Sequence, residues 1–158
     1  MAYKVFLSHS TKDERTIRSI IKLLQQRGLE VFVAEWHINP GADLTSNIMN
    51  SIRSSHCVLA LLTKNGVRST WVNQEIGYAL GLKKLVIPLV EKGTDVNQLG
   101  ALQRLKYVEF QEGMQQDSFI YLANYLNTLK IAKEDQEKWL WTIGLGVLVL
   151  ASIFSGKK

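Results

Sequence analysis

A tryptophan and a carboxylate lie four residues apart in this sequence, at Trp71 and Glu75. Side chains at positions i and i+4 share one face of a helix, and the preceding residues Ser69 and Thr70 are typical helix caps. The carboxylate would then lie about one turn into the helix, near the positive end of the helix dipole. Spacing alone leaves two interpretations open: a functional pair in a site, or a packed tryptophan beside a solvated or capping glutamate.

Other reactive side chains give weaker patterns. Ser8, His9 and Ser10 follow an apolar run, but no sharp nucleophile elbow surrounds them, which argues against a hydrolytic triad. The glycine-rich loops that bind phosphate in dinucleotide-binding and P-loop proteins are absent. The histidines have no spacing suited to a metal, so we expect no metal site. His56 opens an apolar run and is expected to be a satisfied core or edge histidine.

The composition suits one folded domain. The chain has 158 residues, 46% of them hydrophobic, and only two prolines, which excludes wholesale disorder. Cys57 is the single cysteine, so an internal disulfide is excluded and a reducing, cytosolic environment is indicated. The net charge of +5 is spread along the chain without basic runs. We therefore expect no nucleic-acid binding.

Strand and helix patterns alternate through residues 1–130, the segment that must position these side chains. Apolar runs predict five strands, at residues 3–7, 29–33, 57–62, 85–90 and 107–110. Helical spacing of apolar residues predicts helices between most of them and a closing helix after residue 118. The predicted fold class is α/β: a flavodoxin-like, three-layer domain with a five-stranded parallel sheet. Ligands are then expected at the carboxyl ends of the strands, at residues 8–10, 35–44 and 63–75.

The C-terminal segment, residues 139–156, carries no charge. As a helix it would be about 27 Å long, close to the thickness of a hydrocarbon core. Lys138 precedes it, and Trp139 and Trp141 could form an interfacial belt. We predict a single transmembrane helix over 139–156, a charged connector over 131–138, and a tail-anchored protein whose domain 1–130 faces the cytoplasm. The alternative is a buried terminal helix of the globular domain.

Several short sequence motifs, arranged in order along the chain, cover nearly all of residues 1–130. They are Val5 to Asp13, Gly28 to Trp36, Asn39 to Leu44, Ile48 to Ser55, Cys57 to Thr63, Ser69 to Gly77 and Val86 to Leu89. Together they resemble the Toll/interleukin-1 receptor (TIR) domains of prokaryotic type. Prokaryotic members of this family often have an aspartate at the position of Ala34, so the sequence departs from the family pattern at this position.

The resemblance implies an activity. Many TIR domains cleave the nicotinamide–ribose bond of NAD, as NAD glycohydrolases or ADP-ribosyl cyclases, and need the glutamate of a Trp-x-x-x-Glu motif, here Glu75. Nicotinamide leaves as a neutral molecule, so a fixed carboxylate that stabilises the ribosyl cation suffices. By family position Ser8, His9, Trp36 and Trp71 would line the nucleotide pocket. NAD would be a substrate, with no separate cofactor.

The resemblance also implies assembly through the BB loop, Glu35 to Leu44, into homo-oligomers or with other TIR proteins. One hypothesis is therefore a membrane-anchored NAD-cleaving enzyme of prokaryotic antiphage defence, activated by self-assembly, with a linear, cyclic or conjugated ADP-ribose product. The alternative is a non-catalytic membrane-anchored scaffold or adaptor that signals through TIR–TIR association. A small-molecule-binding domain with unrelated activity is the third hypothesis.

Overall fold

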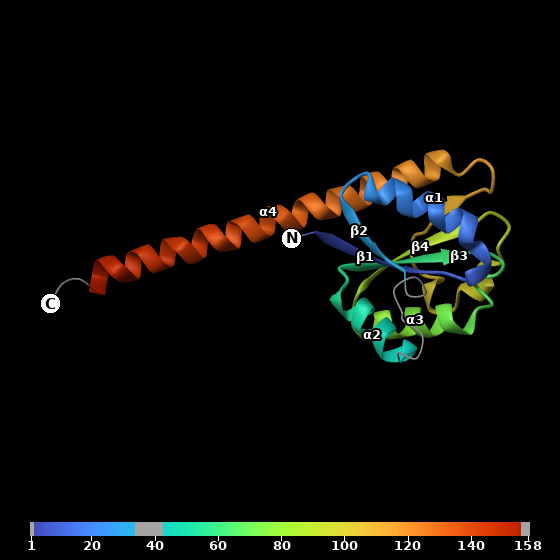
Figure 1. The fold of residues 1–158 in the computed structure, drawn as a ribbon, viewed down its shortest axis with the longest axis horizontal. Helices are drawn as coiled ribbons and strands as arrows, with labels where there is room; N and C mark the ends of the chain where they lie inside the picture. The colour runs from blue at the N-terminus through green and yellow to red at the C-terminus, as the bar shows by residue number, and fades with distance from the viewer. Residues whose placement is uncertain (1, 34–42, 156–158) are drawn as a thin grey trace.

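Five parallel strands form the centre of the molecule. The computed structural model describes the backbone of residues 2–33 and 43–155, and the side chains of these residues as far as residue 140, Val96 excepted. The strand order is β2-β1-β3-β4-β5, which confirms the predicted flavodoxin-like sheet (Figure 1). The strands are β1 (Tyr3–Ser8), β2 (Leu29–Phe32), β3 (Cys57–Leu62), β4 (Leu85–Glu91) and β5 (Val108–Phe110).

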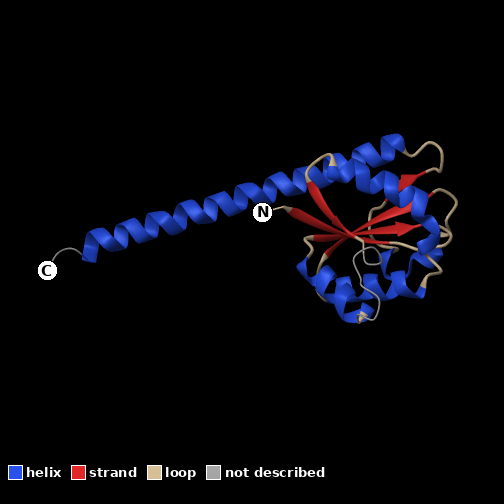
Figure 2. Ribbon diagram, viewed as in Figure 1, coloured by secondary structure: helices blue, strands red, loops and turns tan. Residues whose placement is uncertain are grey.

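Helices cover both faces of the sheet. Figure 2 shows α1 and α4 on one face and α2 and α3 on the other. The helices are α1 (Glu14–Gln25), α2 (Leu44–Ser54), α3 (Thr70–Gly81) and α4 (Gln116–Ser155), with the short 3-10 helices η1 (Thr11–Asp13) and η3 (Val96–Leu102). The predicted three-layer arrangement is therefore confirmed.

The two faces of the sheet have separate apolar cores, because successive side chains of a strand point to opposite faces. In β1, Leu7 packs with the core under α1 and α4, whereas Phe6 packs with the core under α2 and α3. Ser8 follows Phe6 by two positions and so points to the α2–α3 face. This register brings a fully buried hydroxyl to the face on which α3 lies.

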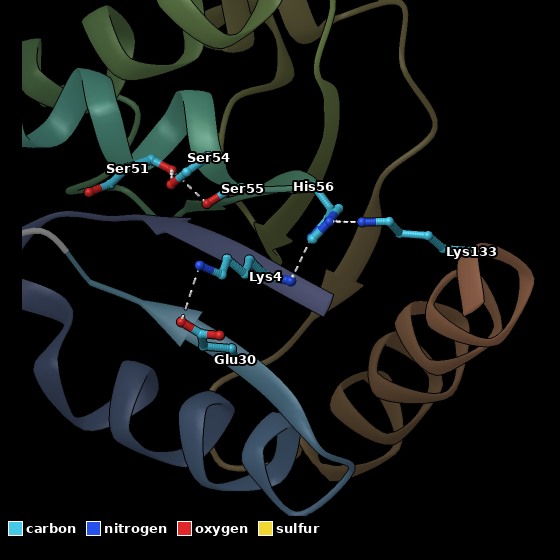
Figure 3. A network of polar contacts seen from close by, with 7 residues as sticks. All are labelled: Lys4, Glu30, Ser51, Ser54, Ser55, His56 and Lys133. Carbon is cyan, nitrogen blue, oxygen red and sulfur yellow. Dashed lines mark hydrogen bonds and ion pairs between the residues drawn. The ribbon is translucent and has the colours of Figure 1, made fainter. Parts of the chain in front are cut away.

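A polar network joins α4 to the amino-terminal ends of the strands (Figure 3). The Nδ1 atom of His56 accepts a hydrogen bond of 2.8 Å from the backbone amide of Lys4, and its Nε2 atom contacts the Nζ atom of Lys133 on α4. The ring stacks on Tyr3, with 4.8 Å between centroids. Burial, together with the positive charges of Lys133 and Lys84, lowers the pKa of His56. The prediction of a satisfied edge histidine is confirmed.

The C-terminal segment belongs to one long helix in the structure. Residues 131–138, expected to be a connector, continue α4 without a break, and the same helix runs on to Ser155 and extends beyond the sheet (Figure 1). Most of the predicted transmembrane segment, 139–156, lies beyond the residues whose side chains are described. Across the described part of the chain, no helix combines the length and hydropathy that a membrane crossing requires. The predicted anchor therefore has no support from the structure, and the location of the protein in the cell stays a prediction.

Candidate functional site

The carboxylate of Glu75 is buried where α3 meets the carboxyl end of β1. Only 8% of Glu75 is exposed, which is unusual for an acidic residue. The hydroxyl of Ser8 donates a hydrogen bond of 2.5 Å to its Oε2 atom. Two positions that the family resemblance marked, 67 residues apart in sequence, are thus in direct contact. The hydrogen bond fixes the carboxylate relative to the sheet.

Local sequence explains why Glu75 reaches this position. The hydroxyl of Ser69 accepts a hydrogen bond from the backbone amide of Val72 and caps the amino terminus of α3. Val72, Ile76 and Ala79 are buried against the sheet, so the rotation of the helix about its axis is set by apolar packing. Glu75 lies beside this apolar stripe, which turns its carboxylate toward β1.

Trp71 and Glu75 line one small cavity between α2 and α3, so the predicted shared face is present. Its volume is about 40 Å³. Trp71 is 50% exposed and Met49, on the opposite wall, is 40% exposed. The lining residues repeat at i, i+3, i+4 and i+7 on each helix: Thr45, Ile48, Met49 and Ile52 on α2, and Trp71, Gln74, Glu75 and Tyr78 on α3. The cavity is an apolar crevice with one buried carboxylate at its wall.

The α2 wall of this cavity was missed from the sequence. Apolar spacing alone predicted a helix between the second and third strands, and that helix was assigned no role in a site. The same spacing also places Thr45 and Met49 on the side of α2 that faces α3. A helical-wheel comparison of the two helices could have identified this pair of facing surfaces.

The remaining predicted site residues divide into two groups. His9 directly follows Ser8, is 8% exposed, and its Nδ1 atom lies 3.4 Å from the carbonyl oxygen of Leu7. Trp36 and most of the predicted BB loop, 35–42, lie outside the described residues. The described end of that loop is Asp43, which caps α2 by accepting hydrogen bonds from the amides of Thr45 and Ser46. Hydrogen bonds from Ser46 lower the pKa of the Asp43 carboxyl group.

Metal binding and thiol chemistry receive no support from the geometry of the described residues. In the ranges 2–33 and 43–155, no three His, Cys, Asp or Glu side chains gather as metal ligands would. Cys57 is fully buried, and burial raises the pKa of its thiol to about 12. A thiol with this pKa is protonated at neutral pH and is a poor nucleophile.

Known proteins resemble this chain in sequence and in fold. Residues 5–122 match the TIR domain family. The chain is 31% identical over 74 residues to the probable 2′ cyclic ADP-D-ribose synthase TcpO of Methanobrevibacter olleyae, covering 46% of this chain and 22% of that protein. It is 27% identical over 97 residues to the 2′ cyclic ADP-D-ribose synthase AbTIR of Acinetobacter baumannii, covering 58% of this chain and 36% of the relative.

The chain thus spans about a fifth to about a third of the length of these two relatives. Among solved structures, the TIR domains of the activated Roq1 resistosome superpose with a TM-score of 0.61 at 16% identity. That match covers 84% of this chain and 99% of the other. The family match extends over most of the sequence, and the described fold agrees with it. The chain belongs to the TIR domain family.

Proposed function

We propose that this protein cleaves the nicotinamide–ribose bond of NAD and releases the ADP-ribose part in cyclic or linear form. The observation that carries the proposal is the buried carboxylate of Glu75, held by Ser8 at the wall of a crevice that Trp71 also lines. Two prokaryotic relatives named as 2′ cyclic ADP-D-ribose synthases support it. ADP-ribose is what remains of NAD when nicotinamide has left.

The chemistry needs one well-placed negative charge. When the bond between C1′ of the ribose and the nicotinamide nitrogen breaks, its electron pair moves to that nitrogen and neutralises the pyridinium ring. Positive charge then develops on C1′ and the ring oxygen of the ribose. A carboxylate already fixed in place stabilises this charge without reorganising, and the low dielectric of a buried site strengthens the interaction. In this proposal Glu75 supplies that carboxylate and Trp71 forms the adjacent wall.

The fate of the ribosyl cation decides the product. Addition of water at C1′, with loss of one proton, gives linear ADP-ribose. Addition of a hydroxyl oxygen from the other ribose of the same molecule, again with loss of one proton, gives a cyclic ADP-ribose. The second outcome requires that water be kept from the cation until the molecule closes on itself. The names of the two relatives favour the cyclic product for this chain.

The crevice must open to receive substrate. A volume of about 40 Å³ holds about one water molecule, whereas ligand pockets commonly reach about 300 Å³ or more. Met49 and Trp71 are half-exposed and flank the opening, and methionine adapts its shape easily. Self-assembly through the BB loop, which the family resemblance implies, would supply the energy for such a change.

A role in antiphage defence belongs to the same proposal.

Product analysis tests the proposed function. The purified full-length protein and its Glu75→Gln variant are incubated with NAD over a range of protein concentrations, and the products are separated and identified by mass. We expect nicotinamide and an ADP-ribose species from the wild type and neither from the variant. No product from the wild type at any concentration, or equal product from both proteins, would overturn the proposal. The first of these results would favour the scaffold hypothesis.

A further inference from the structure

A second cavity lies at the carboxyl ends of β1 and β3. Its volume is about 340 Å³. Six residues from η1 and its cap, the β3–α3 loop and the cap of α3 line it: Ser10, Lys12, Lys64, Asn65, Arg68 and Ser69. We call it the basic pocket, because half of its lining side chains are cationic and, among the described residues that line it, none is acidic.

The three cations of the basic pocket are not paired directly with carboxylates among the described residues. Within the described residues, Lys12, Lys64 and Arg68 form no ion pair at 4.0 Å or less. Two carboxylates contact the surrounding loop, Asp13 through side chains and Glu91 through a backbone amide, and they offset part of the positive charge of the three cations. Like charges gathered around one cavity repel one another, and a bound anion would relieve this repulsion.

The loop that carries two of these cations has a fixed shape. The hydroxyl of Thr63 donates to Asp13 over 2.7 Å and accepts hydrogen bonds from the backbone amides of Asn65 and Gly66. The side-chain amide of Asn65 donates to the other oxygen of Asp13 over 3.0 Å. A Cβ atom on Gly66 would lie 2.4 Å from the carbonyl oxygen of Leu61, so the loop passes directly against the end of β3. The pocket is therefore formed before any ligand binds.

The basic pocket is connected to the site of Glu75 through two short segments. Ser10 lies two positions after Ser8, whose hydroxyl donates a hydrogen bond to the Glu75 carboxylate. Ser69 caps the helix that carries Glu75, and the two are about 9 Å apart along its axis at 1.5 Å per residue. The boundary between β1 and β3 is also where this strand order changes direction, the usual place for a ligand in an open α/β sheet.

We infer that the basic pocket binds the pyrophosphate of the dinucleotide while the nicotinamide ribose lies at Glu75. The identity of the ligand rests on the proposed function, whereas the preference for a phosphate anion rests on the pocket alone. Arg68 offers a planar fork of donors that suits phosphate oxygens, and Lys12 and Lys64 add compact charges. The amino terminus of α3, capped by Ser69, adds the positive end of a helix dipole.

The test is direct binding of two probes, inorganic pyrophosphate and ADP-ribose, measured by calorimetry on the full-length protein. The test variant is Lys64→Gln/Arg68→Gln. The control is Arg104→Gln/Lys106→Gln, which removes the same two kinds of charge from exposed positions outside the basic pocket. We expect the Kd for both probes to rise about tenfold or more in the test variant, from the loss of charge-assisted hydrogen bonds, and to stay unchanged in the control.

Turnover of NAD provides a second readout. The test variant should raise KM and largely retain kcat, because the pyrophosphate is held equally in the ground state and the transition state. No pyrophosphate binding by the wild type, or equal binding by both double variants, would overturn the inference. The proposed function fails separately: if the wild type consumes no NAD while the basic pocket still binds pyrophosphate, the proposed function is wrong and the preference of the pocket for a phosphate anion stands.

Discussion

The Ser8→Ala variant tests whether the position of the Glu75 carboxylate matters for activity, because it removes a hydrogen bond to the carboxylate and leaves the carboxylate itself in place. The hydroxyl of Ser8 is fully buried and donates to the Glu75 carboxylate over 2.5 Å. A hydrogen bond to a charged partner contributes about 1.5–3 kcal/mol, and Ser8→Ala removes this one from the Glu75 carboxylate. If the carboxylate acts in the transition state, the same free energy corresponds to a fall in kcat/KM of about 10- to 100-fold. The variant removes one oxygen atom, so the cavity it leaves is small.

A matched control exists at the opposite end of the strands. Ser55 is 3% exposed and its hydroxyl donates to the carbonyl oxygen of Ser51 over 2.7 Å. Ser55→Ala should lower the free energy of unfolding by about 1 kcal/mol and leave NAD turnover unchanged. Both variants are compared in denaturant titrations and in steady-state kinetics. If Ser8→Ala turns over NAD as fast as Ser55→Ala, the hydrogen bond does not position the carboxylate and this reasoning is refuted.

Three further variants test other parts of the fold. Gly66→Ala would place its Cβ atom 2.4 Å from a backbone oxygen, so we expect a loss of about 1–3 kcal/mol in the free energy of unfolding. Gly77→Ala, which meets nothing within 4 Å inside α3, should gain about 0.5–1 kcal/mol, and equal melting temperatures would contradict both expectations. The lowered pKa of His56 means that, below its ordinary value of 6.5, the unfolded chain binds more protons than the folded one. Stability should therefore fall as pH decreases below about 6.5, and His56→Gln should reduce that fall, as measured by urea midpoints on both sides of this pH. A wild type that is no more sensitive to acid than the variant would show that His56 does not contribute.

Much of the architecture followed from local pattern. Cys57–Leu62 was predicted with its observed bounds, because six consecutive apolar residues suit a strand that is buried on both faces. Ser69 was expected to begin the helix that carries Glu75, and its side chain does cap α3. The handedness of strand crossovers then left few sheet orders, and the simplest of them is the one observed.

The hydrogen bond between Ser8 and Glu75 could not be predicted from the local sequence pattern. It depends on Ser8 sharing the Phe6 face of β1 and on the rotation of α3 about its axis, and both are set by packing across the sheet. Residues 131–138 were expected to be a charged connector, and their secondary structure was not predicted. They are helical in the structure, where Lys133 and Glu137 are 3.3 Å apart as an i,i+4 pair, and such pairs support an exposed helix.

The rate of nicotinamide release tests the central claim most directly. It is measured for the wild type, for Glu75→Gln, and for Glu109→Gln, which neutralises an exposed carboxylate on β5. The account predicts that the wild type and Glu109→Gln release nicotinamide at equal rates. Glu75→Gln should be slower by at least about 100-fold, since it loses the charge that stabilises the ribosyl cation. Equal rates for the wild type and Glu75→Gln, with both proteins folded, would contradict it.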